Sequence, residues 1–212
     1  MEEPRTVVVY MEQTPNPAAL KFVTNAALLV QGSAEFTNKQ DALASPLAYS
    51  LFDFTGVRSV FIAENFVTVT KTEEIEWWDI QNIVREYIRS YLVSGDDIFD
   101  KELMAQLQSK PRKTEIHAAA VPVEKPTPQH YSDAENNAIS EKIMATLDEY
   151  IKPAVAQDGG AIDFKSFEDG IVTLVLKGSC SGCPSSTITL KHGIERVLKS
   201  MIPEVSEVIA EQ

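Results

Sequence analysis

Cysteine is scarce in this sequence. Only two cysteines, Cys180 and Cys183, occur among 212 residues, separated by two residues. Two cysteines cannot build a disulfide framework. In a reducing compartment a lone Cys-x-x-Cys pair more often binds a metal or exchanges disulfides than serves as a structural cross-link. This pair is therefore the first place in the chain to look for chemistry.

Long apolar runs are absent as well. No stretch approaches the about 20 residues that a membrane-spanning helix needs. The first five residues are acidic and lack both the basic start and apolar block of a secretory signal and the Arg- and Ser-rich make-up of a transit peptide. These features predict a cytoplasmic protein that has no cleaved segment and no membrane partner.

Positive charge is limited: 19 basic residues stand against 31 acidic ones, which gives a net charge of −12. The electrostatic field of a protein with this net negative charge repels nucleic acid, whose binding depends on Lys and Arg contacts to phosphate. No Ser/His/Asp, Walker or Rossmann pattern occurs. The sequence therefore predicts no nucleic-acid partner and offers no catalytic residues.

The first half of the chain predicts a compact α+β domain over residues 6–95. Its β-branched and alternating runs predict two hairpins, and Ser45-Pro46 is typical of a helix start, with Ser as N-cap and Pro in the first turn. An apolar stripe at helical spacing predicts a second helix, with Trp77-Trp78 at its start. One of these indoles is expected to pack on the sheet and the other to lie at its rim; an interaction patch is the alternative. The predicted strands are 6–10, 19–23, 56–62 and 66–70, and the stripe consists of Ile80, Ile83, Val84, Tyr87, Ile88 and Tyr91.

Residues 108–132 predict a flexible linker, because four prolines stand among Lys, Thr, Ala and Gln with no apolar period. The two domains that it joins are expected to move independently. Residues 97–107 before it are compatible with one or two further helical turns.

The remaining 133–212 predict a helix–hairpin–helix–strand unit. Ile139, Ile143, Leu147 and Ile151 repeat every four residues, and Pro153 is expected to kink this helix or to start its last turn. A stop at Gly159-Gly160 precedes the hairpin. The second helix follows the cysteines, with Ile188, Leu190, Ile194, Val197, Leu198 and Met201 as its apolar residues, and a strand near 205–209 ends the unit.

The segment around the cysteines favours metal binding. Gly178 and Gly182 let the backbone bend tightly. Pro184 predicts a helix start, whose N–H groups and dipole are expected to lower the pKa of both thiols. Thioredoxin-like exchange requires a larger parallel βαβ layout, and zinc would need further ligands than His192, which is expected on a helix surface. Asp158 is expected to tie a turn.

Two thiolates per chain cannot complete a cubane cluster, which is usually held by four cysteines. If the ligand is an iron–sulfur cluster, two chains must share it across a two-fold axis, and each supplies Cys180 and Cys183. A cluster at such a junction is easily assembled and lost, which suits transfer better than permanent electron transport.

Motifs in both halves of the sequence resemble those of the NifU-like (Nfu) family of iron–sulfur carrier proteins. The second half carries Asp158-Gly-Gly160, Phe167-Glu-Asp-Gly170, Leu176-Lys-Gly-Ser-Cys-Ser-Gly-Cys-Pro-Ser-Ser186 and Thr189-Leu-Lys-His-Gly-Ile-Glu195. The first half carries Gln13-Thr-Pro-Asn-Pro17, Leu20-Lys-Phe22, Ser45-Pro-Leu-Ala48, Gly56-Val57 and Phe66-Val-Thr-Val-Thr-Lys71. Ala161 departs from the acidic or polar residue common in the family after the double glycine.

The resemblance implies a homodimer that holds a 4Fe–4S cluster between its paired C-terminal domains, with 2Fe–2S as the alternative. Cys180 and Cys183 would be the ligands. The cluster would come from upstream assembly proteins and pass to apo iron–sulfur proteins, and the first domain would modulate partner choice. Such a carrier is not an enzyme. A thiol–disulfide oxidoreductase that uses the same pair is the alternative function.

Overall fold

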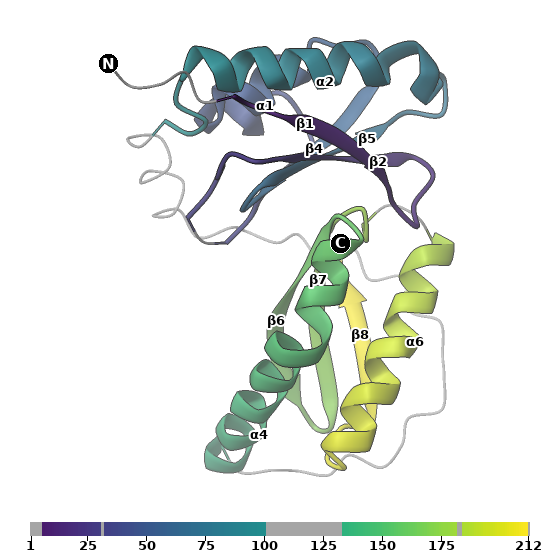
Figure 1. Cartoon of the computed structure of the whole chain (residues 1–212). Helices are drawn as coiled ribbons and strands as arrows, with labels where there is room; N and C mark the ends of the chain where they lie inside the picture. Colours follow the sequence, from purple (N-terminus) through teal and green to yellow (C-terminus); the bar gives the residue numbers. More distant parts are fainter. Residues whose placement is uncertain (1–5, 31, 101–132, 182–183, 212) are drawn as a thin grey trace.

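The computed structural model shows an α+β chain of two domains (Figure 1). It describes residues 6–30, 32–100, 133–181 and 184–211, without the side chains of 133, 134 and 184–186.

The first domain is built on a five-stranded sheet with the order β1-β2-β5-β4-β3, in which all neighbours are antiparallel. The two predicted hairpins, β1–β2 and β4–β5, are confirmed, although β1 begins at Val9 rather than at residue 6. The short strand β3 and the 3₁₀ helix η1 were not predicted. The elements are β1 Val9–Gln13, β2 Ala19–Thr24, β3 Ala34–Phe36, η1 Asp41–Ala44, α1 Pro46–Leu51, β4 Val57–Ala63, β5 Phe66–Lys71 and α2 Trp77–Ser94.

The two α-helices of this domain cover one face of the sheet. Ser45 caps α1 as predicted: its side chain accepts a hydrogen bond from the Ala48 N–H at 3.3 Å. Val84 and Ile88 of α2 are fully buried against the sheet, whereas Ile83 is 58% exposed, so its predicted burial is wrong. Ile83 lies about 100° around the helix from Val84, outside the buried stripe.

The adjacent indoles at the start of α2 have different surroundings. Trp77 packs against the core, and its Nε1–H donates a hydrogen bond to the Pro17 carbonyl oxygen at 3.1 Å. Trp78 is 71% exposed. The prediction that one indole packs and the other lies at the rim is thereby confirmed.

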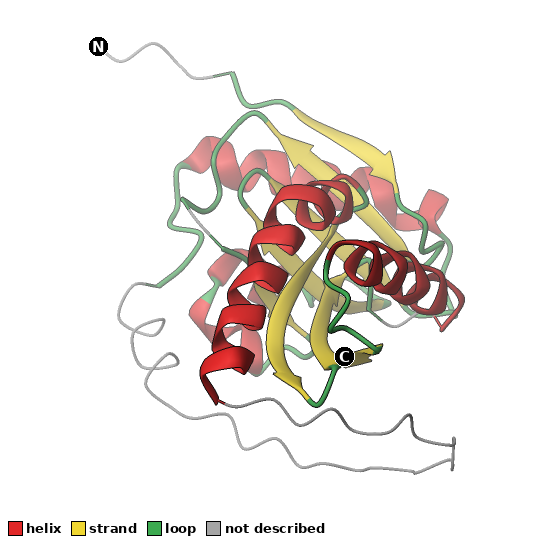
Figure 2. Ribbon diagram, turned by 90° about the horizontal axis from the view of Figure 1, so that it is seen from below, coloured by secondary structure: helices red, strands yellow, loops and turns green. Residues whose placement is uncertain are grey.

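The second domain has the predicted helix–hairpin–helix–strand order. Its sheet has the order β6-β7-β8, with β6–β7 antiparallel and β7–β8 parallel. Figure 2 shows its long helices α4 and α6 flanking these strands. The elements are α4 Asp133–Thr146, the π-helical turn η2 Leu147–Ile151, α5 Lys152–Gln157, β6 Gly160–Glu168, β7 Ile171–Gly178, α6 Pro184–Met201 and β8 Glu207–Glu211.

The irregularity predicted at Pro153 takes the form of a π turn. Proline lacks the N–H of a regular helix, and its ring clashes with the carbonyl four residues before it. A π turn widens the helix just before Pro153, where the Lys152 N–H bonds to the Leu147 carbonyl oxygen. The helix resumes as α5, and Gly159, at φ +81°, follows its end.

The core of this domain lies between the helices and the sheet. Ile139, Ile143, Leu147 and Ile151 are all buried, as their spacing predicts. In α6, Ile194 and Leu198 are buried, whereas Ile188 and Met201 are 55% and 48% exposed. The sequence analysis named these two only as apolar residues of the helix, and hydrophobic type alone does not fix the face on which a residue stands.

The two domains are in contact in the structure, whereas the sequence predicts that they move independently. The second face of the five-stranded sheet lies against β7 and the turns beside it (Figure 1). Val23, Phe61, Ala63 and Phe66 on that face form a buried cluster with Ala161 of β6. All six residues of β2 are buried, because one face of the strand meets the helices and the other meets the second domain.

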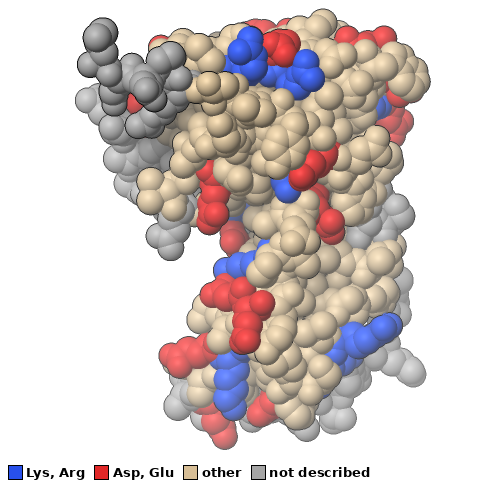
Figure 3. All heavy atoms as spheres, in the orientation of Figure 1, with Lys and Arg blue, Asp and Glu red and all other residues tan. Residues whose placement is uncertain are grey.

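The predicted linker, 108–132, lies outside the described residues. Residues 97–100 form no helix, and the rest of the helical turns suggested before the linker also lies outside them. In the part of the chain that the structure describes, no helix is long and apolar enough to cross a membrane. Acidic and basic side chains are interspersed over both domains on the face drawn in Figure 3.

Candidate functional site: the cysteine loop

The candidate site is the loop between β7 and α6. Gly178 ends β7 with φ +67°, and the Ser181 N–H closes a turn onto the Gly178 carbonyl oxygen at 3.1 Å. Cys180 stands within this turn, and α6 begins at Pro184 as predicted. Cys183 lies outside the described residues.

Cys180 is turned toward the interior of its own domain. It is 6% exposed and belongs to the core cluster of the second domain. Gly160 lies beside the thiol: a Cβ built on Gly160 would lie 2.5 Å from the Cys180 Sγ and 2.7 Å from the Lys177 carbonyl oxygen. The second glycine of the Asp-Gly-Gly turn therefore provides the space in which the thiol lies.

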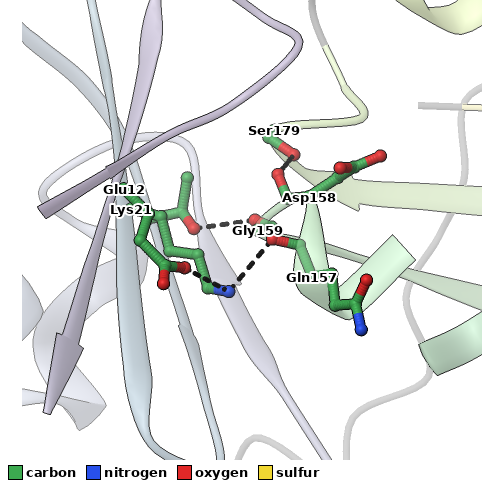
Figure 4. A network of polar contacts seen from close by, with 7 residues as sticks. Glu12, Lys21, Gln157, Asp158, Gly159 and Ser179 are labelled. Atoms are coloured by element: carbon green, nitrogen blue, oxygen red, sulfur yellow. Dashed lines mark hydrogen bonds and ion pairs between the residues drawn. The ribbon is translucent and has the colours of Figure 1, made fainter. Parts of the chain in front are cut away.

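Hydrogen bonds join the Asp158–Gly160 turn to the cysteine loop. The Ser179 Oγ donates to the Asp158 carbonyl oxygen at 2.5 Å, as drawn in Figure 4, and the Ser179 N–H donates to the Gly159 carbonyl oxygen at 3.2 Å. The Thr187 Oγ1 of α6 donates to the Cys180 carbonyl oxygen at 3.1 Å. The loop that carries Cys180 is thus held by the Asp158–Gly160 turn and by α6, and Asp158 takes part through its backbone carbonyl oxygen.

Burial raises the pKa of the Cys180 thiol to about 11. The Ser179 hydroxyl, 3.8 Å from the Sγ, opposes this shift, whereas the charges of Asp158 and Glu35 add to it. The prediction that the loop lowers this pKa is therefore wrong for Cys180. No acidic residue stands within the loop in sequence, but the fold brings two carboxylates near it and removes water from the thiol.

Alkylation rates measure this effect. In a Cys183→Ser variant, Cys180 should react with iodoacetamide at pH 7.5 about 100-fold more slowly than an ordinary cysteine, because a pKa raised by about two units leaves about 100-fold less thiolate. The rate should rise about tenfold per pH unit up to about pH 10, and urea should abolish the difference. A rate that levels off below pH 9 in the folded protein would contradict the raised pKa of the Cys180 thiol.

The remaining predicted residues fall as follows. His192 is exposed on α6, as expected. In the described ranges, no group of three or more His, Cys, Asp or Glu side chains gathers to hold a metal ion. Sequence reasoning missed the side chains of the first domain that reach this site. Asn16 and Glu35 bind the cysteine loop, and Lys21 and Thr68 bind the turn at 157–159. Asn16 lies in the predicted Pro-Asn-Pro turn, but nothing in the sequence showed what this turn contacts.

The fold and the loop define a class of protein with two α+β domains, the second of which carries a Cys-x-x-Cys loop between a strand and a helix. Comparison with known families agrees. Residues 9–95 match the family described as scaffold protein Nfu/NifU N terminal, and residues 143–209 match the NifU-like domain.

Individual relatives cover nearly the whole chain. It is 35% identical over 210 residues to "NifU-like protein 5, mitochondrial" of Arabidopsis thaliana. The matched region covers 98% of this chain and 69% of that protein. It is 37% identical over 205 residues to human "NFU1 iron-sulfur cluster scaffold homolog, mitochondrial", which covers 96% of this chain and 72% of that one. A solution NMR structure of a NifU-like protein from Saccharomyces cerevisiae is 27% identical, with a TM-score of 0.43, over 48% of this chain and 91% of that one. The chain belongs to the Nfu/NifU-like family.

The relatives contradict the prediction of a cytoplasmic protein. NifU-like proteins 5 and 4 of A. thaliana and human NFU1 are all named as mitochondrial, which points to mitochondria rather than the cytoplasm. The first residues could not decide the location, since this chain spans only 69% and 72% of the lengths of two of these relatives.

Proposed function

We propose that this chain is a carrier of iron–sulfur clusters that binds a 4Fe–4S cluster between two copies of itself and transfers it to apo iron–sulfur proteins. Cys180 and Cys183 of each copy would supply the four thiolate ligands. Its partners would be a second copy, an upstream assembly protein that provides the cluster, and the recipients. The cluster is cargo in this function, so no residue is catalytic and the protein is not an enzyme.

One observation carries the proposal: the chain has only two cysteines, and the described one is built into a glycine-lined loop at the junction of β7 and α6. Thiolate sulfur is the ligand that iron–sulfur clusters require, and a cubane usually takes four. Two loops related by a two-fold axis would bring four thiolates together. The name of the human relative, which calls it an iron–sulfur cluster scaffold, supports the same function.

The surroundings of Cys180 fit a cluster that must be released. The thiol has to lose its proton when it binds iron, and burial beside Asp158 and Glu35 opposes that loss. Gly160 supplies room beside the sulfur, and Ser179 and Thr187 hold the loop backbone. Protonation of the thiol would therefore compete with iron and favour departure of the cluster.

Cluster transfer tests the function directly. The reconstituted protein, mixed anaerobically with an apo-protein that requires a 4Fe–4S cluster, should activate that recipient within minutes, even when a chelator is present to capture free iron. Circular dichroism in the visible range follows the cluster as it changes hosts. Activation that disappears when the chelator is added would show release of iron into solution instead of transfer.

The thiol–disulfide oxidoreductase remains the second candidate, but the structure gives it little support. A dithiol that attacks disulfides needs an accessible thiolate, and an attacking thiol works best when its pKa lies near the ambient pH. Cys180 is nearly buried, with a pKa raised to about 11. Reduction of insulin disulfides that is lost in Cys180→Ser would favour this candidate over the carrier.

A further inference from the structure

The face of the first domain's sheet that is turned away from its helices binds the cysteine loop of the second domain. We call the side chains that make this contact the clamp face. It comprises Asn16, Lys21, Glu35, Phe61 and Thr68. Its polar contacts reach the two segments that frame Cys180, namely the turn at 157–159 and the loop at 178–181.

Asn16 binds the backbone on both sides of Cys180. Its Nδ2 donates to the Ser179 carbonyl oxygen at 3.1 Å and to the Ser181 carbonyl oxygen at 3.3 Å. Asn16 is only 2% exposed. Its Oδ1 accepts the Ala18 N–H at 3.0 Å within its own turn, which leaves the amide nitrogen directed at the loop. A hydrogen bond within the first domain therefore helps to orient this side chain toward the loop.

Glu35 of β3 binds the start of the same loop. Its Oε1 accepts the Gly178 N–H at 2.9 Å and the Ser181 hydroxyl at 3.2 Å. Together with Asn16, it contacts three of the four residues from 178 to 181. Hydrogen bonds to an ionised carboxylate are stronger than those between neutral groups. This contact therefore stabilises the association of the first domain with the loop.

Two further bonds reach the turn that precedes β6. The Thr68 Oγ1 of β5 donates to the Gly159 carbonyl oxygen at 2.7 Å. The Lys21 Nζ of β2 donates to the Gln157 carbonyl oxygen at 3.0 Å (Figure 4). Lys21 is also paired with Glu12 at 3.1 Å. Thr68 and Lys21 are 1% and 7% exposed, so this side of the sheet is covered by the second domain.

Shape agrees with the polar contacts. A Cβ on Gly178 would lie 2.9 Å from the Phe61 ring, and one on Gly159 would lie 3.0 Å from the Thr68 Oγ1. Both residues have positive φ, so glycine already suits their backbone conformation. Because these two glycines have no side chain, Phe61 and Thr68 of the sheet can come into contact with the backbone of the second domain. The glycines beside Cys180 therefore serve the domain contact as well as the loop.

We propose that the clamp face recognises the cluster-free cysteine loop of its own chain and holds it closed, with the Cys180 thiol turned inward. A second copy cannot approach the backbone at 178–181 while Asn16 and Glu35 occupy it, so the clamp must release the loop before two chains share a cluster. This second step rests on the proposed function, whereas the closed contact does not. The first domain would then act as a gate for cluster loading.

The test uses two matched pairs of substitutions in the full chain. N16D keeps the acceptor that Ala18 uses but places an oxygen opposite the two loop carbonyls, and T68V removes one hydroxyl without changing shape. The control, N25D/T24V, makes the same chemical changes in the first domain. Among the described residues, Asn25 and Thr24 hydrogen-bond to backbone of that domain, at Val8, Thr6 and Ala26.

Hydrogen–deuterium exchange of peptides that cover 157–161 and 176–181 is measured without a cluster, together with small-angle scattering. N16D/T68V should exchange at least about tenfold faster than wild type in these peptides and have a larger radius of gyration, whereas N25D/T24V should match wild type. T68V alone, which removes a single hydroxyl, should give a smaller effect of the same sign and keeps the test decisive if the double variant unfolds.

Equal exchange in wild type and both clamp variants would overturn the proposal. Equally faster exchange in N25D/T24V would also overturn it. Protection from exchange that depends on protein concentration would overturn it as well, because the contact would then lie between two chains and not within one. Cluster uptake tests the second step: N16D/T68V should take up iron and sulfide faster than wild type, and an unchanged rate would overturn the gate. If no protein takes up a cluster while the exchange difference persists, the proposed function fails and the closed contact stands.

Discussion

Replacing Cys180 by serine is expected to abolish cluster binding. The proposed site has four ligands, two from each chain, so this substitution removes half of them. A serine hydroxyl stays protonated at neutral pH and offers hard oxygen in place of soft sulfur. Iron retained after anaerobic reconstitution and desalting should fall at least about tenfold. Iron analysis and the visible absorption of the cluster measure this loss.

The matched experiment is Cys183→Ser, which should give the same loss, since both residues are proposed as ligands. Cys180 is buried in the core of its domain, so far-UV circular dichroism must show that Cys180→Ser remains folded. Serine is close to cysteine in size, and a large change of fold is not expected. If either variant retained more than half of the wild-type iron with an unchanged spectrum, the assignment of that cysteine would be wrong.

Gly160→Ala has the second-largest expected effect. The added Cβ would lie 2.5 Å from the Cys180 Sγ and 2.7 Å from the Lys177 carbonyl oxygen. The second of these atoms is backbone, so the clash cannot be relieved by rotating a side chain. We expect the second domain to lose about 1–3 kcal/mol of stability and the loop to bind less cluster. Urea unfolding followed by far-UV circular dichroism gives the free energy.

Gly193→Ala is the control for this change. Gly193 lies within α6, and a Cβ there meets no atom within 4 Å. Alanine in a helix interior should stabilise the domain by about 0.5–1 kcal/mol, so the two substitutions have opposite expected signs. Both tryptophans, Trp77 and Trp78, lie in the first domain, so fluorescence reports separately whether that domain is affected. Equal effects of the two substitutions would contradict the contact seen at Gly160.

Local signals in the sequence were sufficient for most of the fold. The N-cap at Ser45, the stop at Gly159 and the four-residue spacing from Ile139 to Ile151 each have a local physical cause, and each holds in the structure. The strand β3 could not be found in this way. It is three residues long, too short for alternation to show, and it owes its position to pairing with β4.

The candidate site was predictable only in part. Its location follows from the two cysteines and the glycines around them, and the structure places Cys180 in the predicted strand-to-helix loop. The pKa of Cys180 was mispredicted because the fold buries the thiol, and because Asp158 and Glu35, which are distant in sequence, lie close enough in space to add to the shift. The clamp face was missed because Asn16, Glu35 and Thr68 lie far apart in sequence, and the contact between the domains brings them to the two segments that frame Cys180.

The most direct test of the central claim is the iron content and mass of the full chain after anaerobic reconstitution with iron and sulfide. A cluster shared by Cys180 and Cys183 of two copies predicts a brown dimer with about four iron atoms per two chains, together with Mössbauer parameters of a 4Fe–4S cluster. A colourless monomer, or a cubane held by a single chain, would contradict it.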